Sequence, residues 1–290
     1  MLVVARAESQ ELQPRAFSAS PVGANFLLVA YSYSDGALYF GPSVPVTNAH
    51  GYVSGTKLGF GRTFAIGGVQ SLVSVAVPHY WSRLTGTLGG ADTGDSRSGW
   101  GDLSATLSVN FVGSPALSRG AFAQRPPAPL IVGASLSVIA PTGDYHPSKP
   151  FNFGTNRWGF KPEVGISYSV KQKLYLDLYT GIWLFTPNTN FFTGGRTLSQ
   201  EPIWSTQAHV SYVFAPGTWA AFDGTYYSGG SISVNSAPPE ARQYNSRVGV
   251  TVALGLAPRQ SLRINGSVGA SVRFGQDFST LGVAYQLLWF

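Results

Sequence analysis

Residues 160–170 read Phe160-Lys161-Pro162-Glu163-Val164-Gly165-Ile166-Ser167-Tyr168-Ser169-Val170. The even positions are mainly large and apolar, whereas the odd positions carry Lys, Glu, Gly and Ser. Successive side chains of a β-strand point to opposite faces, so this alternation separates an apolar face from a polar one. A helix through the same residues would mix both sets on every side. The stretch therefore predicts an amphipathic β-strand.

The same alternation recurs along most of the chain. It is clear in residues 174–185, 203–214, 247–256 and 262–273, and less clean in residues 103–111 and 130–138. It is weaker near residues 24–33, 52–63 and 68–81, where the two faces are less distinct. Counting the segments predicts twelve strands, each long enough to cross a membrane at a tilt.

Composition indicates where the apolar faces lie. Charged residues make up only 11% of the 290 residues, against about 25% in soluble domains. No window of about 18 consecutive apolar residues predicts a transmembrane helix. Strands can cross lipid only as a closed barrel, because every backbone group must find a partner there. The polar faces are mostly Ser, Gly, Thr and Asn, as expected of a narrow wet lumen.

The connections alternate in length, which separates a membrane barrel from a soluble sandwich. Long connections are expected near 34–50, 85–98, 141–157, 187–200 and 230–244, and short ones near 65–68, 171–173, 215–217 and 257–260. Outer-membrane barrels have short periplasmic turns and long outer loops. The Pro-rich stretch 113–129 and the short loop near 275–277 are exceptions. We therefore predict an all-β, transmembrane, antiparallel up-and-down β-barrel in a Gram-negative outer membrane, with both termini periplasmic.

The two ends of the chain carry separate signals. Ala5-Arg6-Ala7 has the small-x-small form of a signal-peptidase site, although an ordinary flexible terminus is an alternative. We expect a signal-peptide remnant at 1–7, a flexible segment at 8–22 and the barrel at 23–290. The last strand ends in Phe290, which resembles the signal read by the barrel assembly machinery. It departs from the usual form because Trp289, not Phe290, is in phase with the apolar face.

Several classes of function find no support in the sequence. There is no Cys, and His50, His79, His146 and His209 are scattered without ligand spacing, so no metal site or cofactor is expected. The net charge of +6 forms no basic run, so no nucleic-acid partner is expected. No G-x-S-x-G motif occurs.

Charged and polar side chains on the polar faces are candidates for the lumen, because a charge near the lipid midplane costs about 2–4 kcal/mol. One interpretation is a constriction that selects solutes by charge. The other, which we favour, is a set of ion pairs that fill a narrow barrel. The candidates are Lys57, Asp102, Lys161, Glu163, Asp177, His209, Asp223, Arg247, Arg263 and Arg273.

Several ordered motifs lie in residues 140–235. They are 140–145 (APTGDY), 152–163 (NFGTNRWGFKPE), 186–188 (TPN), 191–195 (FFTGG), 198–203 (LSQEPI), 207–209 (QAH), 214–219 (FAPGTW) and 223–230 (DGTYYSGG). With these motifs the chain resembles the outer-membrane transporter family named after the meta-pathway of phenol degradation. The resemblance implies a barrel that moves hydrophobic or aromatic compounds, a function inferred for that family largely from gene context.

Aromatic side chains cluster around these motifs at the expected outer rim. They form either the external aromatic girdle or an apolar mouth for aromatic solutes made by loops 141–157 and 187–200. The residues are Phe151, Phe153, Trp158, Phe191, Phe192, Tyr226 and Tyr227. We expect a passive channel for small hydrophobic or aromatic compounds, in contact with outer-membrane lipid. The alternatives are a structural or surface-interaction barrel with a closed lumen and, third, an outer-membrane hydrolase.

Overall fold

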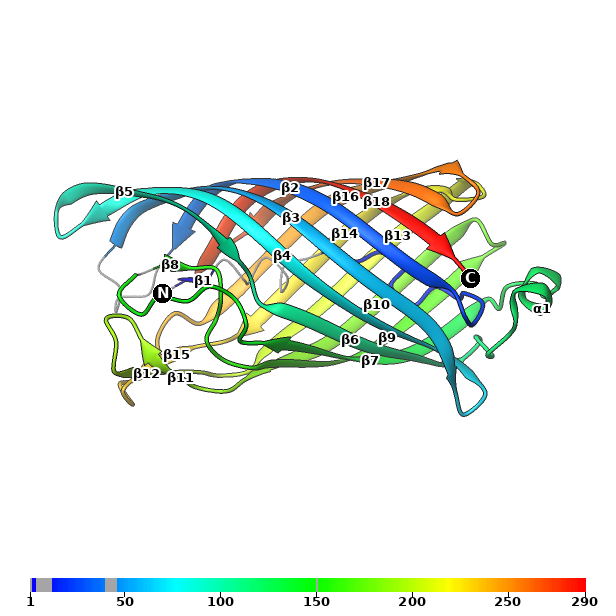
Figure 1. Ribbon diagram of the computed structural model, residues 1–290, viewed down its shortest axis with the longest axis horizontal. Coiled ribbons are helices and arrows are strands. Elements are labelled where there is room, and N and C mark those ends of the chain that lie inside the picture. Colours follow the sequence, from blue (N-terminus) through cyan, green and yellow to red (C-terminus); the bar gives the residue numbers. More distant parts are fainter. Residues whose placement is uncertain (1, 4–11, 40–45, 150) are drawn as a thin grey trace.

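The computed structural model describes residues 2–3, 12–39, 46–149 and 151–290 (Figure 1). Its wall is an antiparallel sheet. The strands of the wall are β2 (Asn25–Tyr39), β3 (Val46–Ile66), β4 (Val69–Leu88), β5 (Ala91–Trp100), β6 (Leu103–Val112), β7 (Leu130–Ala140), β9 (Gly159–Val170), β10 (Leu174–Phe185), β13 (Ile203–Ala215), β14 (Thr218–Gly229), β16 (Gln243–Ala257), β17 (Gln260–Ser271) and β18 (Gly275–Trp289).

The sheet closes on itself. Strand β18 pairs with β2 from Gly275–Tyr39 to Trp289–Asn25, and β3 pairs with β4, so the described strands close into a ring. Strands β5 and β6 both pair with β4 and follow one another along its length, so they occupy one position in the wall. The predicted transmembrane β-barrel of twelve strands is confirmed.

The two ends of the barrel differ, as Figure 1 shows. At one end, here called the turn end, short turns join β3 to β4, β9 to β10, β13 to β14 and β16 to β17. The connection 113–129 lies there too and carries α1 (Arg119–Gln124). The other, the loop end, carries the short strands β1 (Leu2–Val3), β8 (Phe151–Asn152), β11 (Asn188–Phe191), β12 (Arg196–Gln200) and β15 (Ile232–Val234).

Side chains alternate between lumen and exterior as residues 160–170 predict. In β9, Glu163, Ser167 and Ser169 are buried, whereas Val164 and Ile166 are exposed. The outward aromatics form two bands. Near the loop end they include Trp81, Trp100, Trp158, Trp204, Tyr226 and Tyr244, and near the turn end Phe60, Phe111, Tyr168, Tyr212, Phe214 and Phe222. These bands match the girdles that flank the apolar zone of membrane barrels.

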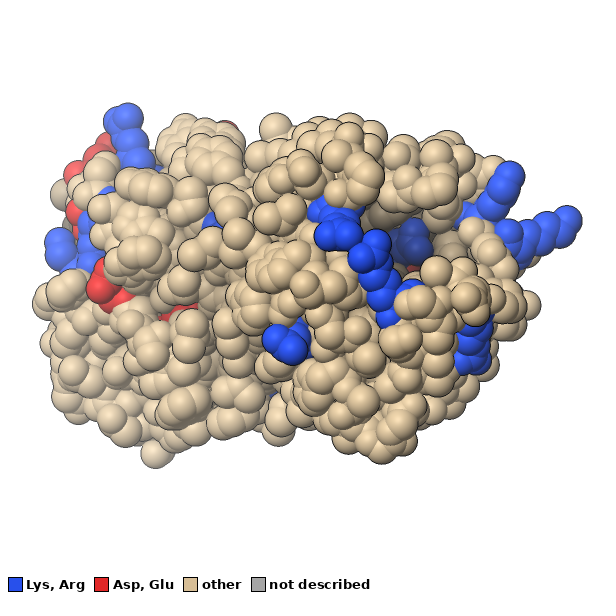
Figure 2. Space-filling model, turned by 45° about the vertical axis from the view of Figure 1, so that its right-hand side comes forward, with Lys and Arg blue, Asp and Glu red and all other residues tan. Residues whose placement is uncertain are grey.

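Charged side chains are sparse on the outer wall in the face that Figure 2 shows, and Lys and Arg gather toward the turn end. Lys171, Lys173 and Arg259 lie in short turns there. Among the described residues, no helix is long and apolar enough to span a membrane.

Two connections differ from expectation. Residues 85–98, expected as a long loop, form a strand hairpin that turns at Gly89 and Gly90 and extends β4 and β5 beyond the rest of the wall. Both turn residues have positive φ, which glycine adopts without strain. Residues 34–39 and 46–50, expected within a loop, are strand as well. Apolar and polar residues alternate only weakly in these stretches, so the sequence pattern does not predict the outer ends of the strands.

The ends of the chain lie apart. Asn25 and Trp289, which begin and end the wall, pair at the turn end, in line with the expected topology. Leu2 and Val3 pair with Phe151 and Asn152 at the loop end. Apart from these two residues, the expected signal-peptide remnant lies outside the described residues.

The alternation generates a test of which face meets lipid. Val250 and Leu256 both point outward from β16, Val250 at the strand centre and Leu256 beside the turn. Replacing Val250 with Arg should lower the free energy of unfolding by about 2–4 kcal/mol, whereas Leu256→Arg should cost about 0–1 kcal/mol, because the penalty falls toward the interface. Urea titration in lipid vesicles measures both. Equal losses would contradict this placement of the strand in lipid.

Candidate functional site: the barrel lumen

Several predicted lumen residues form pairs, within one strand or between neighbouring strands. Lys161 and Glu163 make an ion pair, and the Lys161 ammonium lies 5.8 Å from the centroid of the Trp183 ring. His209 on β13 and Asp223 on β14 are directly paired in register, with 2.7 Å between His209 Nδ1 and Asp223 Oδ1. Thr251 Oγ1 donates to the other oxygen of Asp223 at 2.6 Å. These contacts hold buried charges against the wall.

Residues 12–24, here called the inner segment, lie inside the barrel. Its backbone amides donate to side chains of the wall: Gln13 N to Gln207 Oε1 at 3.3 Å, Arg15 N to Asp177 Oδ2 at 3.1 Å, Ala16 N to the Tyr179 hydroxyl at 3.1 Å and Ser20 N to Gln70 Oε1 at 2.7 Å. The segment thus crosses from β13 to β4 before β2 begins. Residues 12–22, expected to be flexible, are bonded to the wall along this path.

Phe17 anchors the inner segment. Its ring is only 2% exposed and meets the Tyr179 ring edge-on at 5.1 Å. A Cβ atom added at Gly165 would lie 2.2 Å from the Phe17 ring, and one at Gly133 would lie 2.6 Å from it. Asn110 Nδ2 donates to the Phe17 carbonyl at 3.0 Å. Glycine on the inner faces of β7 and β9 therefore makes the space that Phe17 fills.

Loop 141–157 folds inward at the loop end and carries two of the predicted rim aromatics with it. Phe151 and Phe153 are 5% and 0% exposed and pack against Tyr80, Leu38 and Phe278 of the wall. The Phe153 ring stacks on Tyr80 with centroids 6.0 Å apart. This group, here called the outer cap, lies inside the mouth and not on its rim.

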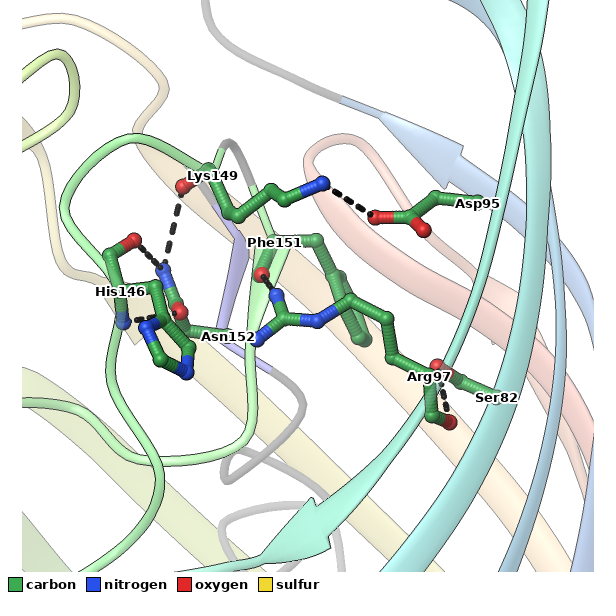
Figure 3. A network of polar contacts seen from close by, with 7 residues as sticks. All are labelled: Ser82, Asp95, Arg97, His146, Lys149, Phe151 and Asn152. Atoms are coloured by element: carbon green, nitrogen blue, oxygen red, sulfur yellow. Dashed lines mark hydrogen bonds and ion pairs between the residues drawn. The ribbon is translucent and has the colours of Figure 1, made fainter.

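Buried and charged groups hold the outer cap in place. Asp102, in the break between β5 and β6, accepts from the Gly143 amide at 2.9 Å and from the amide and hydroxyl of Thr155 at 2.8 and 2.6 Å. Arg97 on β5 reaches across to the loop and donates to the Phe151 carbonyl at 2.7 Å, and Lys149 lies 3.4 Å from Asp95 (Figure 3). Asn152 closes the turn by donating to the carbonyls of His146 and Lys149.

A second group of loop residues joins loop 141–157 to β11. Asn188 donates to the Tyr145 hydroxyl at 2.9 Å, and that hydroxyl donates to the Asn190 carbonyl at 3.0 Å. Burial raises the pKa of Tyr145, although the hydrogen bond from Asn188 and the charge of Arg157 oppose the shift. Tyr145 therefore stays neutral at physiological pH and can both accept and donate. The two loops expected to form a mouth are bonded into one unit.

The remaining rim aromatics divide into three environments. Trp158 and Tyr226 are exposed on the outer wall, where Trp158 stacks on Phe160. Tyr227 is buried on the inner face. Phe191 is buried in the small sheet β11–β12–β15, and Phe192 packs on the same group. The seven predicted aromatics therefore do not form one surface.

A cavity of about 200 Å³ remains in the lumen between the inner segment and the outer cap. It is lined by Leu12 of the inner segment and by Tyr80 and Phe278 of the outer cap. Lys57, Arg247 and Arg263 line it too. Arg273, also expected in the lumen, is exposed in the connection after β17 beside Tyr244, because that strand ends at Ser271. Among the described residues, this cavity leaves space for a small solute.

His209 faces the lumen and His79 faces outward between Trp81 and Trp100. Neither has a serine as hydrogen-bond partner in the described part of the chain, so the pair that a hydrolase needs is not assembled there. Within residues 2–3, 12–39, 46–149 and 151–290, no three His, Cys, Asp or Glu side chains group as metal ligands.

Sequence reasoning missed the inward aromatics Phe17, Tyr80, Tyr179 and Phe278. One signal was available. In residues 174–185 the polar face carries Tyr175, Tyr179 and Trp183 around Asp177, which is unusual for a water-filled lumen. Bulky residues on that face indicate that the lumen is partly filled at this strand.

Solved structures with this fold include channels and transporters of bacterial outer membranes. The COG4313 outer membrane channel from Pseudomonas putida F1 superposes with a TM-score of 0.77 at 19% identity, over 96% of this chain and 100% of that one. The toluene transporter TodX of Pseudomonas putida gives 0.51 at 12% identity, over 98% and 92%. The transport unit of the autotransporter AIDA-I from Escherichia coli gives 0.57 at 9% identity, over 97% and 95%.

At these identities the superpositions establish the fold, which is that of outer-membrane β-barrels. No curated protein matches the sequence significantly. A family model does match, over residues 46–287, from the first half of β3 into the last strand. The match covers most of the chain, and the chain therefore belongs to the family described as "Putative MetA-pathway of phenol degradation".

Proposed function

We propose that the protein is a passive outer-membrane channel for small hydrophobic or aromatic compounds. The observation that carries this proposal is the cavity between the inner segment and the outer cap, lined by both apolar and polar side chains. The outer membrane holds no ATP, and no energy-coupling segment is recognisable in the sequence, so solutes would move by diffusion. Passage past the inner segment and the cap would require one or both to shift.

The aromatic rings of the outer cap support the proposal of an aromatic solute. Phe151, Phe153, Tyr80 and Phe278 present ring faces and edges at the mouth, and such surfaces favour stacked or edge-on contact with another ring. A toluene transporter has the same general fold. The family name points the same way.

We also propose that the protein contacts lipid through its aromatic bands and reaches the membrane through the barrel assembly machinery. Phe290 follows β18 at the turn end and is 44% exposed, within 5.0 Å of the Arg119 guanidinium. The exposed Phe290 ring beside the seam is available to a recognition protein.

A structural barrel with a closed lumen is the second candidate. The inner segment, the Lys161–Glu163 pair and the His209–Asp223 pair fill much of the lumen on the side of β9, β10, β13 and β14. A barrel filled in this way could act as a scaffold in the membrane. Transport measurements separate the two functions.

The first measurement is solute uptake into liposomes that contain the refolded, heat-modifiable protein. Small polar aromatics should enter faster than in empty liposomes, and sugars of similar size should stay excluded, because the cap offers aromatic contacts but few hydrogen bonds. Equal uptake of both would indicate a general pore. No added uptake of either would support the closed barrel.

Two alanine variants, Phe153→Ala and Trp158→Ala, test the outer cap. Phe153→Ala removes a buried ring of the cap, so uptake of aromatics relative to sugars should fall severalfold while ion conductance rises. Trp158→Ala is the matched control, because Trp158 lies on the outer wall, and its ratio should match the parent protein. Folded yield is checked by heat-modifiable gel mobility. Equal effects of the two variants would contradict a role for the cap in selectivity.

Asp102→Ala tests whether the cap also narrows the mouth. The change leaves the Gly143 and Thr155 amides without their acceptor, at about 1–3 kcal/mol for each buried group, so loop 141–157 should loosen. We expect faster hydrogen exchange at these two amides and a larger single-channel conductance. Asp92→Ala, in the exposed β4–β5 hairpin, is the control. Faster exchange with unchanged conductance would show that the cap does not limit passage.

A further inference from the structure

Charged side chains are distributed unequally between the two ends of the barrel. At the loop end basic and acidic side chains are mixed, as in the pair that Lys149 and Asp95 form. At the turn end the exposed charged side chains of the described residues are all basic: Arg62, Arg119, Arg125, Lys171, Lys173 and Arg259. The acidic side chains that the structure describes lie in the lumen or toward the loop end. The turn end therefore carries positive charge without acidic neighbours.

The six basic side chains are not neutralised within the described part of the chain. None of them forms an ion pair with a described residue. Arg62 donates to Asn25 Oδ1 at 3.4 Å, and the guanidiniums of Arg119 and Arg259 lie 5.0 and 5.9 Å from the centroid of the Phe290 ring. An amide and an aromatic ring are neutral, so these contacts hold the side chains without removing their charge.

Arg62 shows at which depth the charges lie. It points outward from β3, two residues beyond Phe60 of the turn-end aromatic band, or about 7 Å further along the strand. The Phe60 and Trp289 rings lie 6.1 Å apart, and Asn25, the partner of Arg62, donates to the Trp289 carbonyl at 3.4 Å. Aromatic girdles lie at the boundary between hydrocarbon and headgroups. A cation just beyond the girdle therefore lies at the depth of the headgroup phosphates.

Two lysines place similar charge on the other side of the barrel. Lys171 and Lys173 are exposed in the turn between β9 and β10, and Lys171 follows Tyr168 of the same aromatic band by three residues. In the order of the wall, β9 and β10 are separated from the pairing of β2 with β18 by at least two strands on either side. The positive charge thus lies on both sides of the turn end and is not confined to one spot.

We propose that the turn end is a docking surface for anionic phospholipid headgroups, such as that of phosphatidylglycerol. Arg62, Lys171 and Lys173 bind the headgroup phosphates of lipids whose acyl chains lie against the outer wall, and Arg259 extends this surface beside Phe290. The surface lies outside the lumen. The inference therefore goes beyond the channel function and does not depend on it.

Charge complementarity at this depth selects the occupant. Arg and Lys form charge-assisted hydrogen bonds with phosphate, and each Lys or Arg close to an anionic bilayer strengthens the attraction by a factor of about five. Phosphatidylcholine also has a phosphate, but its own cation neutralises it, so the preference is for lipids with net negative charge. Salt screens attraction between exposed charges, and the preference should therefore weaken as ionic strength rises.

The selectivity of the lipids that touch the barrel is measured first. The protein is refolded into phosphatidylcholine bilayers that contain spin-labelled phosphatidylglycerol or spin-labelled phosphatidylcholine. Electron paramagnetic resonance gives the association of each label with the barrel surface. We expect phosphatidylglycerol to associate about twofold more strongly, because a factor of about five at the cationic positions is averaged over the whole surface. The preference should disappear in about 1 M salt.

Equal association of the two lipids would overturn the proposal and leave these cations to a soluble anionic partner. A preference that persists at high salt would overturn it too, because exposed charges would then not be its cause. Neither measurement requires a solute, so failure of the channel function would leave the result unaffected.

A turn-end variant locates the surface. Arg62→Gln, Lys171→Gln and Lys173→Gln are combined, which removes three exposed cations from the turn end. The preference for phosphatidylglycerol should fall most of the way to the value for phosphatidylcholine. Heat-modifiable gel mobility confirms that the variant is folded.

A loop-end variant is the matched control. Arg83→Gln, Arg242→Gln and Arg273→Gln together remove the same number of exposed cations from the loop end, so the net charge changes equally. This variant should keep the preference of the parent protein. Equal loss in the two variants would show an effect of net charge alone, and loss in the loop-end variant only would place the lipid at the other end; either result would overturn the assignment.

Discussion

The backbone hydrogen bonds between β18 and β2 are the constraint on which the rest of this structure depends. They run from Gly275–Tyr39 to Trp289–Asn25 and close the described strands into a ring. An unpaired backbone group in hydrocarbon costs several kcal/mol, so an open sheet of these strands could not remain in a membrane. Closure also separates two environments, and this separation forces every strand to alternate apolar and polar side chains.

Closure creates a second problem, which is how to fill a narrow interior. Glycine and serine on the inner faces of β7 and β9 leave space, and Phe17 and the inner segment occupy it. At the loop end, Phe151 and Phe153 fold inward against the wall. The filling is uneven: the side of β9 to β14 is packed, while the side of β2, β3 and β16 to β18 keeps a cavity. Uneven filling, more than barrel width, defines where a solute can go.

The wall could be predicted from the sequence because lipid imposes a period of two on it. The same parity assigned Glu163, Asp177, His209 and Asp223 to an inner face, where the structure has them. It could not assign their partners, because side-chain pairing depends on the stagger between strands. The partner of Asp177 is the backbone amide of Arg15, and since every residue except proline carries this group, the sequence does not single it out. Loops have no period, so Phe153 and Trp158 look alike in sequence yet lie inside and outside the mouth. Arg273 has the parity of the inner face, but it lies beyond Ser271, where β17 ends, and its side chain is exposed.

The inner segment leads directly into β2, the strand on one side of the seam. Ala24 already bonds to Thr63 of β3, one residue before the wall begins. The part of the chain that occupies the lumen is therefore synthesised before the wall strands that surround it, and pairing of β18 with β2 completes the enclosure. Biogenesis of this barrel thus couples two events that are separate in an empty pore. The pairing that joins β2 to β18 closes the wall around a segment that is covalently continuous with β2.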